Sequence, residues 1–164
     1  MGQRRKARES ALQILYQLEF DETDAGEAQE SFWRKRKAPV ATKDYCRRLV
    51  DGISSHRDEI DEAIESISQH WRVARMALID RNILRLAAYE LLHAGSIAPA
   101  IVINEAIEIA KRYSGPEAAT FVNGILDALR KKIQTGANPE REVKHARKDR
   151  REGKNESRRR AQKD

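Results

Sequence analysis

The chain has 164 residues, enough for one domain with a buried core but leaving little room for a second. Aromatic residues are 5% of the chain and alternating β-branched runs are absent, so the composition argues against a sheet-rich protein and favours an all-α fold. A single cysteine, Cys46, excludes a disulfide framework or a cysteine-rich zinc site and is typical of a reducing cytoplasm.

The net charge of +6 is concentrated at the two ends of the chain. Residues 1–8 carry +4 and residues 138–164 carry +5, which leaves −3 on the rest. Two basic ends indicate a polyanionic partner such as nucleic acid, although charge runs also occur on ordinary solvated surfaces. The amino terminus lacks the apolar run of a secretory signal, and no segment reaches membrane-spanning length, so we expect no membrane association.

The first predicted helix covers residues 4–20. Its flank combines Arg5, Glu9 and Tyr16, and a cation beside an aromatic ring can bind phosphate and stack on an unpaired base. An ordinary amphipathic helix with a half-buried tyrosine explains the same pattern. The inward positions are Ala7, Ala11, Leu12, Ile14, Leu15 and Leu18.

Three further segments show helical periodicity. A helix over residues 26–37 ends before Pro39, and the cations in its last turn offset the helix dipole. Residues 42–68 form two helices, with a kink or break indicated by Gly52 and the polar residues 54–56. Residues 79–93 are apolar around most of the helix circumference and predict a central buried helix, with Asp80 as a first-turn capping carboxylate.

Two last helices are marked by Pro99 and Pro116 at their starts and by Gly115 between them. In the second of these helices, Phe121 lies about a quarter-turn away from the stripe of residues that faces inward. Its position therefore suits either the core or a binding surface. That stripe contains Ala118, Val122, Ile125, Leu126, Leu129 and Ile133.

Gly124 lies on the outward side of the last helix, where glycine costs roughly 1 kcal/mol relative to alanine. We therefore expect something to approach the backbone closely at Gly124. Either another helix of the same domain or a partner protein or RNA satisfies this expectation.

The apolar pattern stops after Gln134. We predict a helical domain over residues 1–136 and a flexible basic tail over residues 137–164, because the tail has too few apolar residues to offset its ordering entropy. The tail would raise RNA affinity without sequence preference, or only add solubility.

No catalytic motif is recognisable in the chain. The histidines, at positions 56, 70, 93 and 145, show no metal-ligand spacing, and phosphate-binding loops, dinucleotide fingerprints and nucleophile elbows are absent. The sequence therefore predicts a binding protein that is not an enzyme and has no cofactor or metal.

Three segments together resemble the NusB family of bacterial transcription antitermination factors. They are RRKARESALQILYQLEF, LIDRNILRLAAYELLH and AIVINEAIEIAKRYSGPEAATFVNGILD, and the resemblance spans roughly residues 3–133. It implies about seven helices in two packed three-helix subdomains with an added helix. It also implies a cytoplasmic bacterial factor that pairs with NusE, a small-subunit ribosomal protein, on the single-stranded boxA element of ribosomal RNA leaders. Other Nus factors and RNA polymerase would complete the antitermination complex.

The same resemblance implies roles for individual residues. Asp80 and Glu117 match acidic positions near the family's RNA and NusE surfaces, without a division between the two partners. The positions implied to bind RNA are Arg4, Arg5, Lys6, Arg8, Tyr16 and Phe121.

Two other functions stay open at this point. A related helical domain occurs fused to ribosomal RNA methyltransferases, where it is an accessory RNA-binding module, but the present chain has no room for a catalytic domain. The second possible function is that of a helical protein–protein adaptor, in which the charged ends are incidental. Homodimerisation would be a way to mask an RNA surface.

Overall fold

The computed structural model describes residues 2–68 and 70–136, which form seven α-helices. The predicted tail at residues 137–164 lies outside the described residues, and its flexibility stays a prediction. The elements, including one short 3₁₀ turn named η1, are α1 (Gln3–Leu18), α2 (Ala25–Arg34), α3 (Val40–Ser55), α4 (Arg57–Ile67), η1 (Val73–Arg75), α5 (Leu78–His93), α6 (Pro99–Tyr113) and α7 (Pro116–Gln134).

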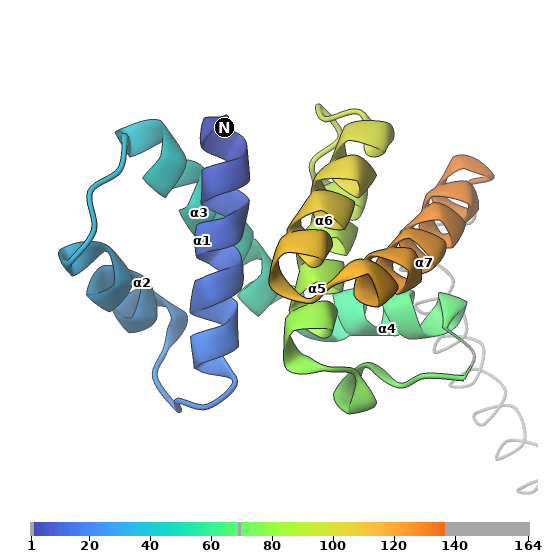
Figure 1. Cartoon of the computed structure of the whole chain (residues 1–164), viewed down its shortest axis with the longest axis horizontal. Helices are drawn as coiled ribbons and strands as arrows, with labels where there is room; N and C mark the ends of the chain where they lie inside the picture. The colour runs from blue at the N-terminus through green and yellow to red at the C-terminus, as the bar shows by residue number, and fades with distance from the viewer. Residues whose placement is uncertain (1, 69, 137–164) are drawn as a thin grey trace, which may run out of the picture.

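The helices form two groups, and α5 of the second group also contacts the first. Figure 1 shows α1, α2 and α3 on one side and α4 to α7 on the other. Helix α5 contacts α1 and α3 as well as α4, α6 and α7, and its residues 82–88 are buried without interruption. The predicted all-α fold and central buried helix are therefore confirmed, and the second group contains the added helix.

The predicted helix boundaries agree with the observed ones to within a few residues. The break expected after Gly52 comes at His56, which separates α3 from α4. Helix α2 ends at Arg34, and beyond it Arg36 donates a hydrogen bond to the carbonyl of Phe32 at 3.0 Å. This contact satisfies one carbonyl at the end of α2, in keeping with the role expected for cations there.

The inward stripe of α7 needs one correction. Val122, Leu126 and Leu129 are fully buried as predicted, and Ile133 is half-buried against the core, but Ala118 is only half-buried and Ala119 is buried instead. Helix α7 packs against α4, α5 and α6 together, so its buried face is wider than the single stripe that its own periodicity defines. Before α7, Gly115 adopts a φ of 112°, which explains why glycine separates α6 from α7.

Cys46 lies in the core of the protein. Cys46 is fully buried, and burial raises the pKa of its thiol to about 12, so it acts as a small apolar core residue. No helix within residues 2–68 and 70–136 is both long and apolar enough to cross a bilayer.

Gly52 is the glycine that tertiary packing requires. A Cβ atom at this position would lie 2.2 Å from Cζ of Tyr89, so the ring of Tyr89 packs directly onto the backbone of α3. By contrast, nothing in the described structure lies within 4 Å of a Cβ atom placed at Gly124. Gly52 and Gly124 therefore have opposite environments.

Replacing Gly52 with alanine should lower the free energy of unfolding by about 1–2 kcal/mol, because displacing the Tyr89 ring outweighs the better helix propensity of alanine. Gly124→Ala is the matched control and should raise it by up to about 1 kcal/mol. Urea unfolding of both variants measures the two changes. Equal effects of the same sign would contradict the close approach of Tyr89 to α3.

Candidate RNA-binding surface

Helices α1 and α6 lie side by side and form one face of the molecule (Figure 1). Polar contacts join them, and three of these show how the two helices are aligned. In order along α1, they are Arg5 with Glu105 at 2.8 Å, Glu9 with Arg112 at 3.0 Å and Gln13 with Tyr113 at 3.5 Å. Because the partners advance together, the two helices run parallel, and both amino termini lie at the same end of this face.

The amino-terminal end of the α1–α6 face carries the predicted cations. Arg4 and Lys6 are exposed, whereas Arg5 is half-buried and donates to both carboxylate oxygens of Glu105 at 2.8 Å. The Arg5 guanidinium holds the pKa of Glu105 below its ordinary value, so this carboxylate stays ionised beside the cations. Arg4 and Lys6 therefore present the most accessible positive charge at this end.

Arg8 has a different environment from its three basic neighbours. Its side chain is 5% exposed, and its guanidinium donates to the two carboxylate oxygens of Glu90 at 2.7 and 2.8 Å. The hydroxyl of Tyr45 donates to the same carboxylate at 2.8 Å. This buried pair ties α1 to α5, which favours a structural role for Arg8 over the phosphate contact expected from the resemblance.

An open groove of about 420 Å³ lies at the cationic end of the face. The side chain of Ile101 at the start of α6 is 55% exposed there, so the groove combines cations with accessible apolar surface. A second hollow of about 330 Å³ lies on the other side of Arg4, between α1 and α3. The first groove is lined by Gly2, Arg4, Arg5, Arg8, residues 96–98, Ile101 and Glu105.

Two aromatic rings lie near the opposite end of α1. Tyr16 is 40% exposed and makes an edge-to-face contact with Phe20, with ring centroids 5.2 Å apart. Phe20, in the turn just after α1, is 64% exposed and was not a predicted site residue, although its spacing of four residues from Tyr16 within the segment predicted to be helical could have indicated it. At a rise of 1.5 Å per residue, about 18 Å separates Arg4 from Tyr16 along α1.

The ends of four helices meet beyond Tyr16. Arg81 at the start of α5 pairs with Glu19 at the end of α1, and Ser114 at the end of α6 donates to Asp80 at 2.7 Å. Asp80 lies in the first turn of α5 as expected, but α5 has no side-chain cap, and in the described structure the Asp80 carboxylate instead accepts a hydrogen bond from the end of α6.

Glu117 and Phe121 lie next to this meeting point, on the first two turns of α7. Glu117 is exposed, and Phe121 is half-buried at the edge of the core. The structure thus gathers Tyr16, Asp80, Glu117 and Phe121 around the ends of α1, α5, α6 and α7, with Arg4 and Lys6 at the far end of α1. We call the α1–α6 face together with these helix ends the cationic–aromatic strip.

Comparisons with known proteins agree with this architecture. A family model described as the NusB family matches residues 5–131. The chain belongs to the NusB family. The transcription antitermination protein NusB of Myxococcus xanthus is 48% identical over 134 residues, which are 79% of this chain and 95% of that protein. The corresponding protein of Syntrophus aciditrophicus is 45% identical over 143 residues, 87% of this chain and 88% of that one.

A solved structure of the antitermination factors NusB and NusE in complex with dsRNA contains a chain of the same fold. Its TM-score is 0.72 at 32% identity, and the match covers 79% of the present chain and 96% of the other. This NusB-family chain therefore shares its fold with a protein that has been seen with both a protein partner and RNA.

The described residues narrow the two explanations for a glycine at position 124 to one. The alternative in which another helix of the same domain packs over it is wrong for the described residues, because the space around it is open. Its neighbour Asn123 is exposed as well. The other expected reason for a glycine at this outward position is close approach by a partner protein or by RNA.

Proposed function

We propose that this protein is a non-enzymatic transcription antitermination factor that acts with NusE on RNA. In this proposal it binds the single-stranded boxA element of nascent ribosomal RNA leaders in the bacterial cytoplasm and helps RNA polymerase to pass terminators, together with other Nus factors. The observation that carries the proposal is the cationic–aromatic strip on a NusB-family fold. Cations supply phosphate contacts, and exposed rings supply stacking surfaces for unpaired bases.

The residues of the strip have different roles in this proposal. Arg4 and Lys6 contact phosphates, and Arg5 is the third cation, shared with Glu105. Tyr16 and Phe20 stack on bases near the end of α1, while Phe121 contacts a base from α7. Arg8 acts through Glu90 to position α1 and does not contact RNA.

The acidic residues fit the protein partner better than RNA. Glu117 is exposed, and an exposed carboxylate repels phosphate, so we assign it to NusE. Asp80 lies beside it at the same helix ends and holds α6 through Ser114. The open backbone at Gly124 belongs to the same helix as Glu117 and provides a second place for NusE to approach.

Fluorescence anisotropy with boxA RNA and a scrambled RNA of equal length tests this function. The titrations are made with and without NusE, across a salt series, with the full chain and with a chain ending at Gly136. The proposal expects a preference for boxA that NusE enhances and that survives loss of the tail. A duplex form of boxA, used as competitor, tests the requirement for a single strand.

Equal binding of both RNAs that disappears with salt or with the tail would contradict the proposal and leave only non-specific charge. NusE binding with no RNA affinity under any condition would instead favour the protein–protein adaptor. Analytical ultracentrifugation of the free protein tests whether a homodimer covers the strip.

Replacing Phe121 with alanine should weaken boxA binding by about 1–3 kcal/mol, the usual contribution of one stacked base. Thermal unfolding should change less than for a core phenylalanine, because the ring is only half-buried. The matched control is Trp71→Ala, an aromatic residue that is 59% exposed between α4 and α5, outside the strip. Equal losses of affinity in both variants would refute the role of Phe121.

Replacing Arg4 with alanine should lower affinity for boxA and scrambled RNA to a similar extent. It should also reduce the slope of log K against log salt by about 0.7, as expected for one phosphate contact on a single strand. Lys131→Ala, at a side chain that is 73% exposed in the last turn of α7, removes the same charge outside the strip. An unchanged slope for Arg4→Ala would contradict a phosphate contact.

A further inference from the structure

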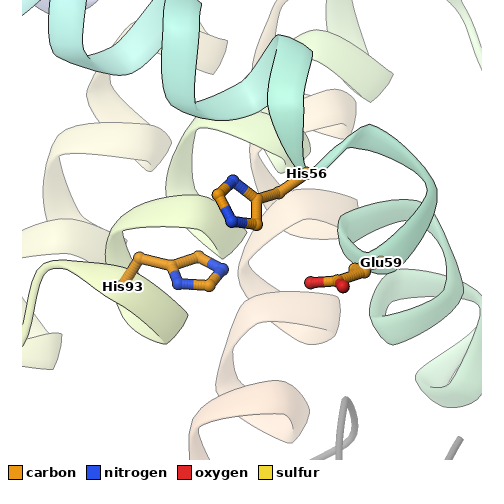
Figure 2. A group of neighbouring side chains, drawn as sticks. All are labelled: His56, Glu59 and His93. Carbon is orange, nitrogen blue, oxygen red and sulfur yellow. The ribbon is translucent and has the colours of Figure 1, made fainter. Parts of the chain in front are cut away.

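A cluster of metal-ligating side chains lies outside the cationic–aromatic strip. His56 forms the joint between α3 and α4, Glu59 lies in the first turn of α4, and His93 ends α5. One ligand atom from each residue lies within 4.8 Å of the other two. Figure 2 shows the two rings and the carboxylate turned toward a common space. Sequence spacing indicated no metal site because His93 comes from a different helix.

The hydrogen bonding of His56 prepares it to be a ligand. Its Nδ1 lies 2.9 Å from the carbonyl oxygen of Gly52, and a carbonyl can only accept, so Nδ1 carries the proton. The lone pair of the neutral ring is then on Nε2. Metal-bound histidines characteristically donate their other nitrogen to a carbonyl or carboxylate in this way, which fixes the tautomer and the ring orientation.

The neighbouring rings hold the two histidines close together. The ring centroids of His56 and His93 are 4.6 Å apart, and the ring of Tyr89 lies 5.2 Å from that of His93. Tyr89 is in turn seated on the backbone of Gly52, so α3 and α5 both restrict this arrangement. The histidine pair is therefore positioned by packed elements rather than by mobile surface side chains alone.

We propose that His56, Glu59 and His93 bind a divalent transition-metal ion of the zinc class. Two imidazole nitrogens and one carboxylate oxygen suit Zn²⁺ and similar ions, whereas Mg²⁺ prefers oxygen ligands and an octahedral shell. With bonds of about 2.0–2.1 Å in a tetrahedral site, ligand atoms stand about 3.3 Å apart. Contraction from 4.8 Å requires small rotations, which the exposed His93 and half-buried Glu59 permit.

A metal ion at this cluster would join the α3–α4 joint to the end of α5. It would thereby link the first group of helices to the second. Binding to the folded state alone would raise stability by mass action. None of the three ligands belongs to the strip, so the ion would act by stabilising the frame that positions the strip, with water in the fourth tetrahedral position.

The test uses the full chain after treatment with a chelator. Thermal unfolding and isothermal titration calorimetry are measured with ZnCl₂, and MgCl₂ serves as the hard-cation control. With zinc at about a hundredfold excess over its Kd, the Tm should rise by about 5–10 °C, and MgCl₂ should produce no comparable rise. CoCl₂ should give visible d–d absorption bands typical of low coordination number.

His93→Ala should abolish the zinc-dependent rise in Tm and the calorimetric signal. The matched control, His70→Ala, removes an exposed histidine outside the cluster and should retain both. If His93→Ala does not fold, Glu59→Gln provides the second variant, and it should weaken zinc binding at least tenfold. Absence of zinc binding to the full chain, or equal binding by wild type and the cluster variant, would overturn the proposal and leave a histidine–carboxylate cluster only.

Discussion

Replacing Glu90 with alanine should lower the free energy of unfolding by about 3–5 kcal/mol, the largest effect we expect from one substitution in this protein. Glu90 is 2% exposed and accepts both hydrogen bonds of the Arg8 guanidinium as well as that of the Tyr45 hydroxyl. Its removal leaves the charge of Arg8 buried, with Glu105 as a more distant partner at 3.8 Å. Urea unfolding at neutral pH measures the change.

The double variant Arg8→Met with Glu90→Leu is the control for this prediction. Replacing both members of a buried ion pair by apolar residues of similar size is often nearly neutral, because no charge stays buried without its partner. The double variant should therefore be much more stable than Glu90→Ala. A loss below about 1 kcal/mol for Glu90→Ala would contradict the description of this pair as a buried anchor between α1 and α5.

The same variants decide the role of Arg8 in RNA binding. The double variant lacks the guanidinium but should keep the position of α1. If Arg8 acts only through Glu90, its boxA affinity should equal that of the wild type within about twofold. A large loss of affinity in a stable double variant would instead assign Arg8 to phosphate, as the family resemblance implies.

Acid should destabilise the protein through Glu19, with a contribution of about 3 kcal/mol. Burial acts to raise the pKa of Glu19, but hydrogen bonds from Arg81 and Asn82 and the charge of Arg85 outweigh it and hold the pKa at about 2, below the ordinary 4.5. A depressed pKa stabilises the folded state when the group is ionised. The contribution is therefore complete above pH 4.5 and is lost as the pH falls toward 2.

Glu19→Gln isolates this contribution because glutamine resembles the protonated acid in shape and does not titrate. The free energies of unfolding of wild type and Glu19→Gln should differ by about 3 kcal/mol at pH 7, and the difference should shrink toward zero near pH 2. Glu30→Gln, at an exposed carboxylate of α2, should show no such convergence. A difference that is independent of pH would show that Glu19 stabilises the fold without its charge.

The ion pairs of Glu19 with Arg81 and Arg85 also hold the cationic–aromatic strip in place. Arg85 is 4% exposed and joins Glu19 of α1 to Asp61 of α4, at 3.0 and 2.8 Å. In the sequence, Arg85 is a charged residue in the mostly apolar segment 79–93 and has no evident partner. The network fastens the end of α1, beside Tyr16 and Phe20, to the central helix.

Helix positions and core faces could be predicted from the sequence because they depend on local periodicity and on backbone chemistry. Proline at the starts of α6 and α7 and glycine between them follow from φ preferences that any chain must obey. The inward residues of α1 follow from the 3.6-residue repeat, and five of the six predicted there are buried. The motifs that resemble the NusB family are local segments of the same kind.

Partners between distant segments depended on the tertiary structure. The sequence does not distinguish the four basic residues near the start of α1, and all four were expected to be available for RNA. Packing buries Arg8 against Glu90 and half-buries Arg5 against Glu105, which leaves Arg4 and Lys6 exposed. A helical repeat indicates which side of a helix faces inward, but not which carboxylate of another helix pairs with a cation on that side. The pairing of a charge is a long-range property.

The sequence by itself determined the all-α class, the approximate helices and the family, because each depends on residues close together in the chain. Only the tertiary structure decided that Gly52 carries the ring of Tyr89, that the space over Gly124 is open, and that His93 meets His56 and Glu59. These features depend on the placement of one helix relative to another. That placement is the sum of many weak contacts between buried surfaces, and local sequence patterns do not encode it one residue at a time.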